Sequence, residues 1–297
     1  MGVKGYKAFN KGMICRGKQY KENATYEENG NEICEAGVMH FCENPFDVLN
    51  YYPLVDKNGG ISDFADVEAI GDIYKEKDKT ATNKLHIGAK LGLKGFIKAC
   101  VDFTIEKTRV ESGKDNETDS SGDSAKIGSS GDSAQIGSSG DCAQIGSSGD
   151  YAKIGSSGYY AKIGSSGYSA QIGSSGYSAK IGSSGYSAKI GSSGDSAQIG
   201  SSGDSAKIGS SGDYAKITSK GKHSVVMAAG YNSIAKAKIG SWITLAEWTR
   251  TDKTDDSDNY IWIPKCVKTE CVDGERIKED TFYKLVDGEF KEVESEE

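Results

Sequence analysis

The sequence predicts a mainly β protein: a flattened β-solenoid of nine-residue repeats, with an N-terminal α+β domain and a C-terminal β cap. Two observations predict this fold class. Between residues 122 and 217, the unit Gly-Ser-Ser-Gly-Asp/Tyr-Ser/Tyr-Ala-Lys/Gln-Ile recurs eleven times without a change of register. The segment before the repeat has mixed helix and strand patterns, and the segment after it has strand patterns with turn signals.

The spacing of alanine and isoleucine predicts one short strand in each unit. Isoleucine recurs every nine residues from Ile127 to Ile217, and an alanine stands two residues before each of them. Residues two apart in a strand share a face, so Ala and Ile point to the same side. The residue between them is always Lys or Gln. Each unit therefore supplies an inward apolar pair and an outward polar side chain.

One nine-residue unit is too short to circle a core, so we expect two successive units per coil, on opposite walls. Ala and Ile from both walls would then face each other across a narrow interior. At about 4.8 Å between stacked strands, five to six coils would form a rod of roughly 25 Å. A winding with one unit per coil and a trimeric winding are the alternatives.

The Gly-Ser-Ser-Gly segments are expected to form the corners, where glycine supplies φ freedom and small volume. The next position is Asp at both ends of the repeat and Tyr in its middle. With two units per coil these tyrosines form two ladders, Tyr159 with Tyr177 and Tyr168 with Tyr186, and Tyr160 lies beside them. Exposed tyrosine clusters are common in contact surfaces. These five tyrosines form a candidate interaction surface, with mutual support of stacked rings as the structural alternative.

Two other interpretations of this Gly- and Ser-rich repeat fit less well. A flexible linker does not keep Ile and Ala in register eleven times. The calcium-binding β-roll repeat G-G-x-G-x-D-x-U-x has the same period. Here, however, its acidic position becomes Tyr in the central units and its apolar U position is Lys or Gln, so no calcium is expected.

Residues 1–105 show the mixed patterns of an α+β head domain. Asn44 is expected to cap a short helix that has Pro45 at its first position. A second helix is expected from Leu91 or Leu93 to about Ile105, because apolar residues recur there at helical spacing. The candidate strands are Gly5–Asn10, Met13–Lys18, Gly37–Cys42, Phe64–Ile73 and Lys84–Ala89.

The rest of the chain divides into four segments. Residues 106–121 are a polar linker or a degenerate first coil, and residues 122–218 are the solenoid. Residues 219–250 are expected to cap the open solenoid end, whose strand edge would otherwise recruit other chains. Residues 251–297 form a C-terminal β-hairpin region with an acidic tail, and Asp273-Gly274 and Asp287-Gly288 are turn signals.

Charge and composition exclude several classes of partner. The net charge is −7, yet the repeat itself is neutral, with seven Asp and seven Lys. Nucleic-acid binding needs a basic stripe and mimicry of DNA needs a strongly acidic surface, and neither is present. No stretch approaches the ~20 apolar residues that a membrane helix needs, and the chain starts without an apolar signal segment. We therefore expect no nucleic acid, no membrane and a cytoplasmic location.

The seven scattered cysteines favour reduced thiols, because no CxxC spacing occurs among them. Cys34, His40 and Cys42, with Cys15 as a fourth ligand, could meet around a metal. Their spacing is not that of a zinc site, and half-buried small residues on neighbouring strands are the simpler interpretation. No metal and no cofactor are expected.

Three segments of the head, followed by the Ser-Ser-Gly-Asp-x-Ala-Lys-Ile units, resemble a family of uncharacterised proteins from bacteriophages and low-GC Gram-positive bacteria. The segments are Lys4-Gly-Tyr-Lys-Ala-Phe-Asn10, Cys15-Arg-Gly-Lys-Gln-Tyr20 and His40-Phe-Cys-Glu-Asn-Pro-Phe-Asp-Val-Leu-Asn-Tyr-Tyr52. The resemblance covers nearly the whole chain. It implies a phage or prophage accessory role, in the host cytoplasm if the protein is phage-encoded.

A second resemblance concerns the head alone. Arg16-Gly17, then His40-Phe41 leading into a short helix, then Val-Glu-x-x-Gly around Glu68, is similar to small ADP-ribosyltransferase folds. The resemblance implies that Arg16 or His40 orients NAD, that Tyr51 or Tyr52 stacks on nicotinamide, and that Glu68 supports an oxocarbenium-like transition state. The chain departs from that pattern, since it has no Ser-Thr-Ser strand and no Glu-x-Glu pair, and its histidine stands on a different strand. A structural arginine, a core histidine and a surface glutamate are the alternative.

Together these patterns favour a non-enzymatic structural or interaction protein. Its solenoid would space the terminal domains or present them to a protein partner. The partner could also be a second copy of the chain, bound through the solenoid faces. The alternative is an ADP-ribosyltransferase-like or nucleotide-binding head, with an anti-defence role. Candidate residues for that alternative are Arg16, His40, Tyr52 and Glu68.

Overall fold

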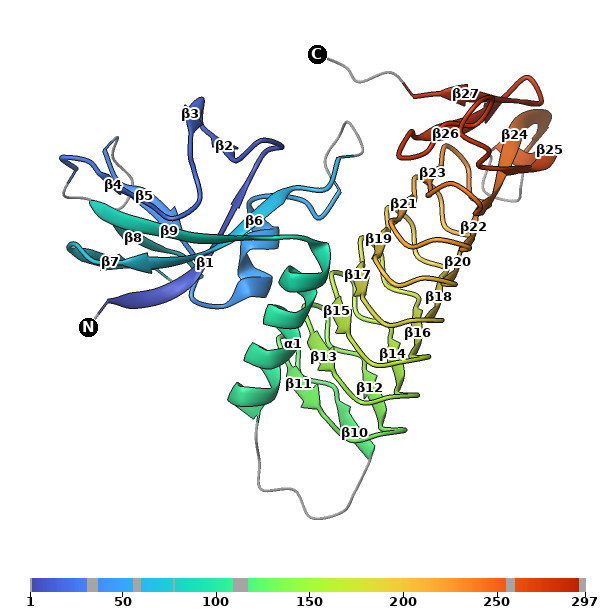
Figure 1. The fold of residues 1–297 in the computed structure, drawn as a ribbon. Coiled ribbons are helices and arrows are strands. Elements are labelled where there is room, and N and C mark those ends of the chain that lie inside the picture. The colour runs from blue at the N-terminus through green and yellow to red at the C-terminus, as the bar shows by residue number, and fades with distance from the viewer. Residues whose placement is uncertain are drawn as a thin grey trace.

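The computed structural model describes residues 2–30, 37–55, 60–76, 78–108, 117–254 and 260–293. It confirms the mainly β architecture, with a solenoid of about seven turns over residues 126–245 and a small N-terminal α+β region (Figure 1). The winding with two units per coil is confirmed too, because each repeat strand pairs in parallel with the strand two units later, as Ile163 does with Ile181.

Two parallel sheets form the walls, which we call the open wall and the covered wall according to what lies outside them. The open wall contains β10 (Glu117–Ser120), β12 (Gln135–Ser138), β14 (Lys153–Ser156), β16 (Gln171–Ser174), β18 (Lys189–Ser192), β20 (Lys207–Ser210) and β22 (Val225–Ala228). The covered wall contains β11 (Lys126–Ser129), β13 (Gln144–Ser147), β15 (Lys162–Ser165), β17 (Lys180–Ser183), β19 (Gln198–Ser201), β21 (Lys216–Ser219) and β23 (Ile234–Lys236).

The solenoid interior is filled by the predicted Ala and Ile rows. From Ile127 to Ile217 every repeat isoleucine is buried, and Ile145 and Ile181 have no exposed surface. Each such side chain contributes on the order of 1.5–3 kcal/mol to folding. The core continues through Val226 and Ile243 into the C-terminal strands.

The corners form for a different reason from the predicted one. Among the described repeat glycines none has a positive φ, whereas the residue before alanine often does, with Ser178 at 56° and Ser187 at 57°. Each corner glycine lies against the backbone of the preceding coil, and a Cβ at Gly158 would overlap the carbonyl oxygen of Gly140. Glycine is thus required by the close approach of successive coils and not by its φ freedom.

Corner aspartates link one coil to the next. The backbone N–H of Tyr168 donates to Asp150 Oδ1 at 2.7 Å, and the N–H of Lys222 donates to Asp204 Oδ1 at 2.7 Å. Each of these carboxylates satisfies an amide of the next coil, which offsets the repulsion between aspartates stacked at successive corners.

The coils continue through most of the segment that the sequence predicts to be a cap over residues 219–250. Strand β22 pairs with β20, and the start of β24 (Trp242–Thr254) pairs in parallel with β22, placing Ile243 beside Val226. The inward apolar positions persist after the nine-residue consensus is lost, so the solenoid extends beyond the repeat.

Antiparallel hairpins close the far end of both walls. Strand β24 pairs with β25 (Tyr260–Cys271) on the open wall, and β26 (Tyr283–Val286) pairs with β27 (Glu289–Glu292) on the covered wall. Asp287 and Gly288 both have positive φ, at 52° and 71°, as a two-residue hairpin turn requires. The outermost strands carry Pro264 and charged side chains, which discourage pairing with another chain.

The head domain contains two main sheets. The first has the order β1 (Val3–Phe9), β6 (Asp63–Ala69), β9 (Lys84–Leu91) and β4 (Ala24–Glu27), and the second has β5 (Met39–Phe41), β8 (Thr80–Thr82) and β7 (Ile73–Lys75). The predicted strand Met13–Lys18 is instead a hairpin of β2 (Ile14–Cys15) and β3 (Lys18–Gln19). The predicted strand Phe64–Ile73 divides between β6 and β7.

Both predicted helices are present. The first is the 3₁₀ helix η1 (Pro45–Asn50), whose N-cap Asn44 accepts the Phe46 N–H at 3.1 Å. The second, α1 (Leu93–Thr108), lies between the head and the covered wall (Figure 1). On its head side, the ring of Phe96 stacks on Phe64 with centroids 3.8 Å apart.

On its solenoid side, α1 packs onto a row of glycines in the covered wall. A Cβ at Gly182 would lie 3.0 Å from Ile97, and a Cβ at Gly200 would lie 3.3 Å from Leu93. Val101 approaches Gly164 in the same way, at 3.5 Å. The outward glycine of each Lys/Gln-Ile-Gly-Ser strand therefore leaves the space that an aliphatic side chain of the helix occupies.

The outward Lys and Gln side chains of the covered wall hold η1 and the segment after it. Lys162 Nζ donates to the Phe46 carbonyl at 3.2 Å and to Asn50 Oδ1 at 2.8 Å, and Lys180 Nζ donates to the Leu49 carbonyl at 2.6 Å. The polar row thus satisfies two carbonyl oxygens of η1, and that of Leu49 lies at its C-terminal end.

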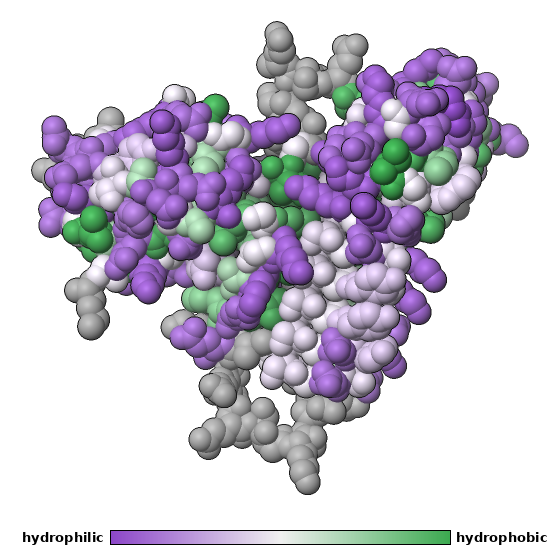
Figure 2. Space-filling view, in the orientation of Figure 1, coloured by the Kyte–Doolittle hydropathy of each residue, from purple (hydrophilic) through white to green (hydrophobic). Residues whose placement is uncertain are grey.

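The head and the covered wall share one apolar core. It joins head residues such as Leu54 and Phe96 to Ile234 of β23 and to Phe282 near β26. Apolar surface gathers in the seam between head and solenoid, whereas the visible solenoid surface is pale because Gly and Ser dominate it (Figure 2). The head is therefore packed along the side of the solenoid.

The two walls offer a matched pair of glycine substitutions. Gly182→Val should lower the free energy of unfolding by about 1–3 kcal/mol, because its side chain would overpack against Ile97. Gly191→Val should keep or raise stability, since a Cβ there meets nothing within 4 Å and β-branched residues favour strands. Urea titrations of both variants test this, and equal destabilisation would contradict the packing described here.

Lys180 should make stability depend on pH. Burial lowers the pKa of its ammonium to about 8, and nearby Lys162 adds to the shift. Between pH 8 and the ordinary value near 10.4 the unfolded chain holds more protons than the folded one, so stability rises with pH there. The urea midpoint should rise from pH 8 to about 9.5, and rise less in Lys180→Met. Lys189→Met, on the open wall, is the control, and an unchanged slope in Lys180→Met would contradict the assignment.

Candidate functional site

The head contains a pocket of about 380 Å³ between β1, the β2–β3 hairpin, β5 and the end of η1. Three of the four residues proposed for a nucleotide site line it: Arg16, His40 and Tyr52. They come from three separate segments of the chain, which the packing of β5 beside β1 brings together through the pair Tyr6–Cys42.

A tight turn positions Arg16. Arg16 and Gly17 have φ values of 50° and 77°, so both adopt the left-handed conformation that a two-residue hairpin between β2 and β3 needs. The turn exposes the guanidinium at the pocket mouth, while Cys15 before it and Lys18 after it also line the pocket.

Lys7 is the buried cation of the pocket, with 6% of its surface exposed. Its Nζ donates to the carbonyl oxygen of His40 at 2.7 Å and lies 5.6 Å from the ring centroids of Phe9 and Tyr20. Burial lowers the pKa of Lys7, and the neighbouring Cys15 opposes that shift. The sequence pattern does not distinguish this residue, because β1 also carries the exposed Lys4 and the burial of Lys7 depends on the packing of β5 beside β1.

Tyr52 and Cys15 meet on the pocket wall. The Tyr52 hydroxyl donates to Cys15 Sγ at 3.2 Å. Burial raises the pKa of Tyr52, and the hydrogen bond to Cys15 raises it further, so the phenol stays protonated at neutral pH. Burial also raises the pKa of the Cys42 thiol to about 12.

Glu68 is not among the lining residues. It stands on β6, in register with Lys4 of β1 and His86 of β9. Among the described residues, Glu28 is the acidic side chain that lines the pocket, and it forms an ion pair with Lys18. The pocket therefore brings together the cationic and aromatic candidates without the carboxylate that the resemblance assigned to transition-state support.

The composition of the pocket suits an anionic ligand that carries a ring. Its cationic side chains attract phosphate or carboxylate groups, and its tyrosines offer faces for stacking. Lys79 is 5.9 Å from the ring centroid of Tyr51 and pairs with Glu76 at 3.0 Å. The cations are Lys7, Arg16, Lys18 and Lys79, and the tyrosines are Tyr6, Tyr20, Tyr51 and Tyr52.

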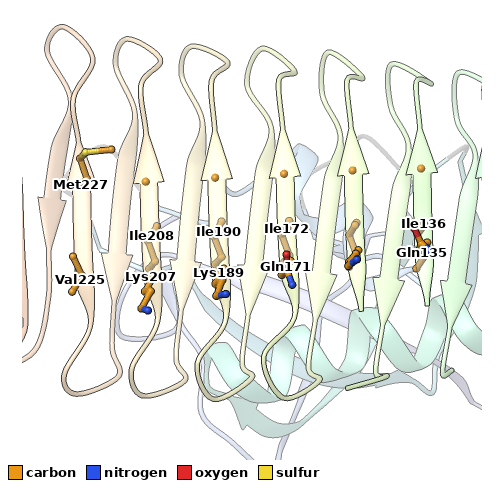
Figure 3. A pocket seen from close by; sticks show the side chains of 17 residues that line it. Gln135, Ile136, Gln171, Ile172, Lys189, Ile190, Lys207, Ile208, Val225 and Met227 are labelled. Carbon is orange, nitrogen blue, oxygen red and sulfur yellow. The ribbon is translucent and has the colours of Figure 1, made fainter. Parts of the chain in front are cut away.

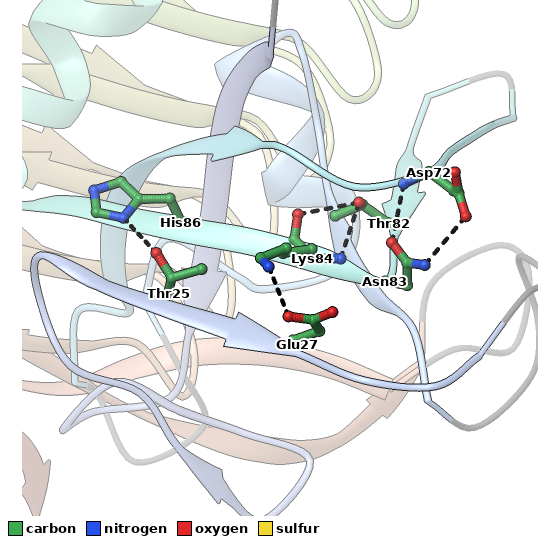
Figure 4. A network of polar contacts seen from close by, with 7 residues as sticks. All are labelled: Thr25, Glu27, Asp72, Thr82, Asn83, Lys84 and His86. Atoms are coloured by element: carbon green, nitrogen blue, oxygen red, sulfur yellow. Dashed lines mark hydrogen bonds and ion pairs between the residues drawn. The ribbon is translucent and has the colours of Figure 1, made fainter.

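A polar network on the β4–β9 edge contains the other head histidine. The side chains of Thr25 and His86 lie 3.0 Å apart (Thr25 Oγ1 to His86 Nδ1), and Lys84 pairs with Glu27 at 2.7 Å (Figure 4). None of these residues lines the head pocket. The network ties β4 to β9 across the sheet, which is a structural role.

The tyrosine ladders lie on the two edges of the solenoid. The rings of Tyr159 and Tyr177 stack with centroids 4.8 Å apart, and those of Tyr168 and Tyr186 stack at 5.4 Å. Tyr160 packs edge-on against Tyr159 at 4.7 Å. All five side chains are 42–51% exposed, so the ladders support the coils and offer aromatic surface at the same time.

The metal hypothesis rests partly on Cys34, which lies outside the described residues. Cys15, His40 and Cys42 all line the head pocket. Among the described residues, no group of three His, Cys, Asp or Glu side chains is arranged to hold a metal ion. No described helix is long and apolar enough to span a bilayer.

Comparison with known proteins concerns the head. Residues 3–99 match a family model. It is described as "Domain of unknown function (DUF7666)", and the match runs from β1 into α1, which includes the head pocket. No curated protein and no solved structure matches the chain.

Proposed function

We propose that this chain is a non-enzymatic interaction protein. Its solenoid is a rigid platform that fixes the head domain along one wall and presents the remaining surfaces to a protein partner. The seam between the head and the covered wall carries this proposal: α1 fills the glycine row, and Lys162 and Lys180 hold η1. A head bound so closely moves with the solenoid as one body.

This seam favours presentation over spacing. A spacer holds domains at opposite ends of a rod, whereas here the head packs along the side of the rod and shares a core with Phe282 near its far end. The surfaces left for a partner are the tyrosine ladders, the open wall and the mouth of the head pocket. The resemblance to phage and Gram-positive bacterial proteins implies an accessory role of a phage or prophage, with a host or phage protein as partner.

Site-specific photocrosslinking tests the proposal. A benzophenone amino acid replaces Tyr177, Tyr186 or Lys189 in turn, and the chain is expressed in the bacterium that carries its gene. We expect a crosslinked partner from at least one of these positions and none from the control position Glu292 on β27. Absence of a crosslink from every solenoid position would contradict a partner-presenting platform.

A second candidate function is binding of a nucleotide by the head. The observation that favours it is the pocket that joins Arg16, His40 and Tyr52 to the buried Lys7. Because Glu68 lies elsewhere, the geometry favours binding without transfer of ADP-ribose.

Isothermal titration with NAD, ADP-ribose and cyclic nucleotides tests this candidate. Arg16→Ala should weaken binding by at least tenfold, since a charged hydrogen bond to phosphate contributes about 1.5–3 kcal/mol. Glu68→Ala is the matched control and should bind like the wild type. No heat with any ligand, or an equal loss in both variants, would count against the head pocket as a nucleotide site.

A further inference from the structure

The open wall carries an unfilled copy of the glycine row that holds α1 on the covered wall. A Cβ at Gly155, Gly173 or Gly191 would meet nothing within 4 Å. A shallow groove of about 1130 Å³ follows this row, from the strand of Gln135 to that of Met227 (Figure 3). The Lys/Gln-Ile-Gly-Ser strands recur on both walls, so over these strands the walls differ mainly in what covers them.

The covered wall shows what this surface accepts. Leu93, Ile97, Val101 and Thr104 of α1 lie over four successive glycines, one side chain per coil. From Leu93 to Thr104 the helix rises about 16.5 Å over eleven steps, while three strand spacings cover about 14.4 Å. A helix slightly inclined to the stack therefore places one side chain over each glycine, aliphatic at Leu93, Ile97 and Val101, and the open wall offers the same spacing.

The polar rows of the two walls differ in what they contact. On the covered wall, Lys162 and Lys180 donate to backbone carbonyls of the head. On the open wall, Lys153, Lys189 and Lys207 are exposed, and none of them forms an ion pair with any described residue. Figure 3 shows Lys189 and Lys207 in one row with Gln171 along the groove. A ligand of this wall should therefore carry negative charge along one flank.

The groove ends on an apolar shelf. Val225, Met227 and Trp242 occupy the outward positions of β22 and β24 and are 48%, 43% and 49% exposed. An exposed apolar group of this kind beside a polar row is typical of a contact surface. It supplies an anchor for one end of a bound segment.

We propose that the open wall binds an amphipathic helix of a partner protein. The helix places aliphatic side chains at positions i, i+4 and i+8 over the glycine row and acidic side chains beside the lysines. This inference rests on the proposed interaction function and gives the chemistry of its partner. A second copy of this chain fits less well, because two open walls would bring their lysine rows together and the apolar face of each α1 is already buried.

A peptide derived from α1 provides the probe. It spans residues 92–106 with Phe96→Glu and Cys100→Glu, because Phe96 and Cys100 share an apolar core with Phe46 of η1, whose carbonyl accepts from Lys162 of the polar row. A lactam joins Lys98 to Asp102, which already pair at 2.6 Å on the exposed side of α1, and keeps the peptide helical. Its binding to the full chain is measured by fluorescence anisotropy.

We expect saturable binding of one peptide per chain, weakened by added salt. The double variant Gly155→Val, Gly173→Val should weaken it at least tenfold while leaving the thermal midpoint of the chain unchanged or higher. Lys153→Glu with Lys189→Glu should weaken it to a similar degree. The control peptide with Ile97→Asp should not bind the wild type.

Absence of saturable binding, or equal affinity for the double glycine variant, would overturn the inference. So would a wild-type dimer in light scattering that the same glycine variant abolishes, because the occupant would then be a second copy. Crosslinks from the solenoid without peptide binding would show that the partner of the open wall is not an amphipathic helix. The proposed interaction function would still hold.

Discussion

The close approach of one coil to the next at the corner glycines is the constraint on which the structure depends. The backbone of Gly158 touches the carbonyl of Gly140, and no side chain fits between them. The parallel ladders set the coil spacing at about 4.8 Å. The corner glycines permit that spacing, at which the Ala and Ile rows are buried and corner aspartates reach the amides of the next coil. The tyrosine ladders follow from the same spacing, because rings on successive coils lie at stacking distance.

The outward glycine of each wall strand determines how the head packs on the solenoid. On the covered wall it admits α1, which is apolar on two sides and joins the head sheet to the solenoid through Phe96 and Ile97. The head pocket depends on this seam indirectly, since Tyr52 follows η1, and η1 is held by Lys162 and Lys180. Surfaces built from the same repeat thus have different roles, one as a contact within the chain and the other as exposed surface.

The features that a local pattern controls could be predicted from the sequence. The Ala-x-Ile spacing predicted the inward rows, the nine-residue length of the unit predicted the two-unit winding, and Asn44-Pro45 predicted the helix cap. Features that depend on tertiary packing could not be predicted. The polar side chains of Gln144 and Lys162 are buried only because the head covers them, and a Lys or Gln stands at the same position of every unit. The sequence pointed to Arg16 and His40, and both line one pocket. The burial of Lys7 and the position of Glu68 outside that pocket could not be predicted, because they follow from how β1, β5 and β6 pair. Arg16-Gly17 is a local turn signal, and the prediction of one continuous strand over Met13–Lys18 missed it.

The two-unit coil also restricts how a gene of this kind can change length. Neighbouring units lie on opposite walls, so gain or loss of one unit would move every later strand to the other wall. The hairpin of β24 and β25 would then stand on the side of the head, and Phe282 would leave the core it shares with Leu54. Recombination between near-identical repeats can therefore preserve this arrangement only if it adds or removes an even number of units. Selection would then act on whether the repeat number is odd or even, more than on the number itself.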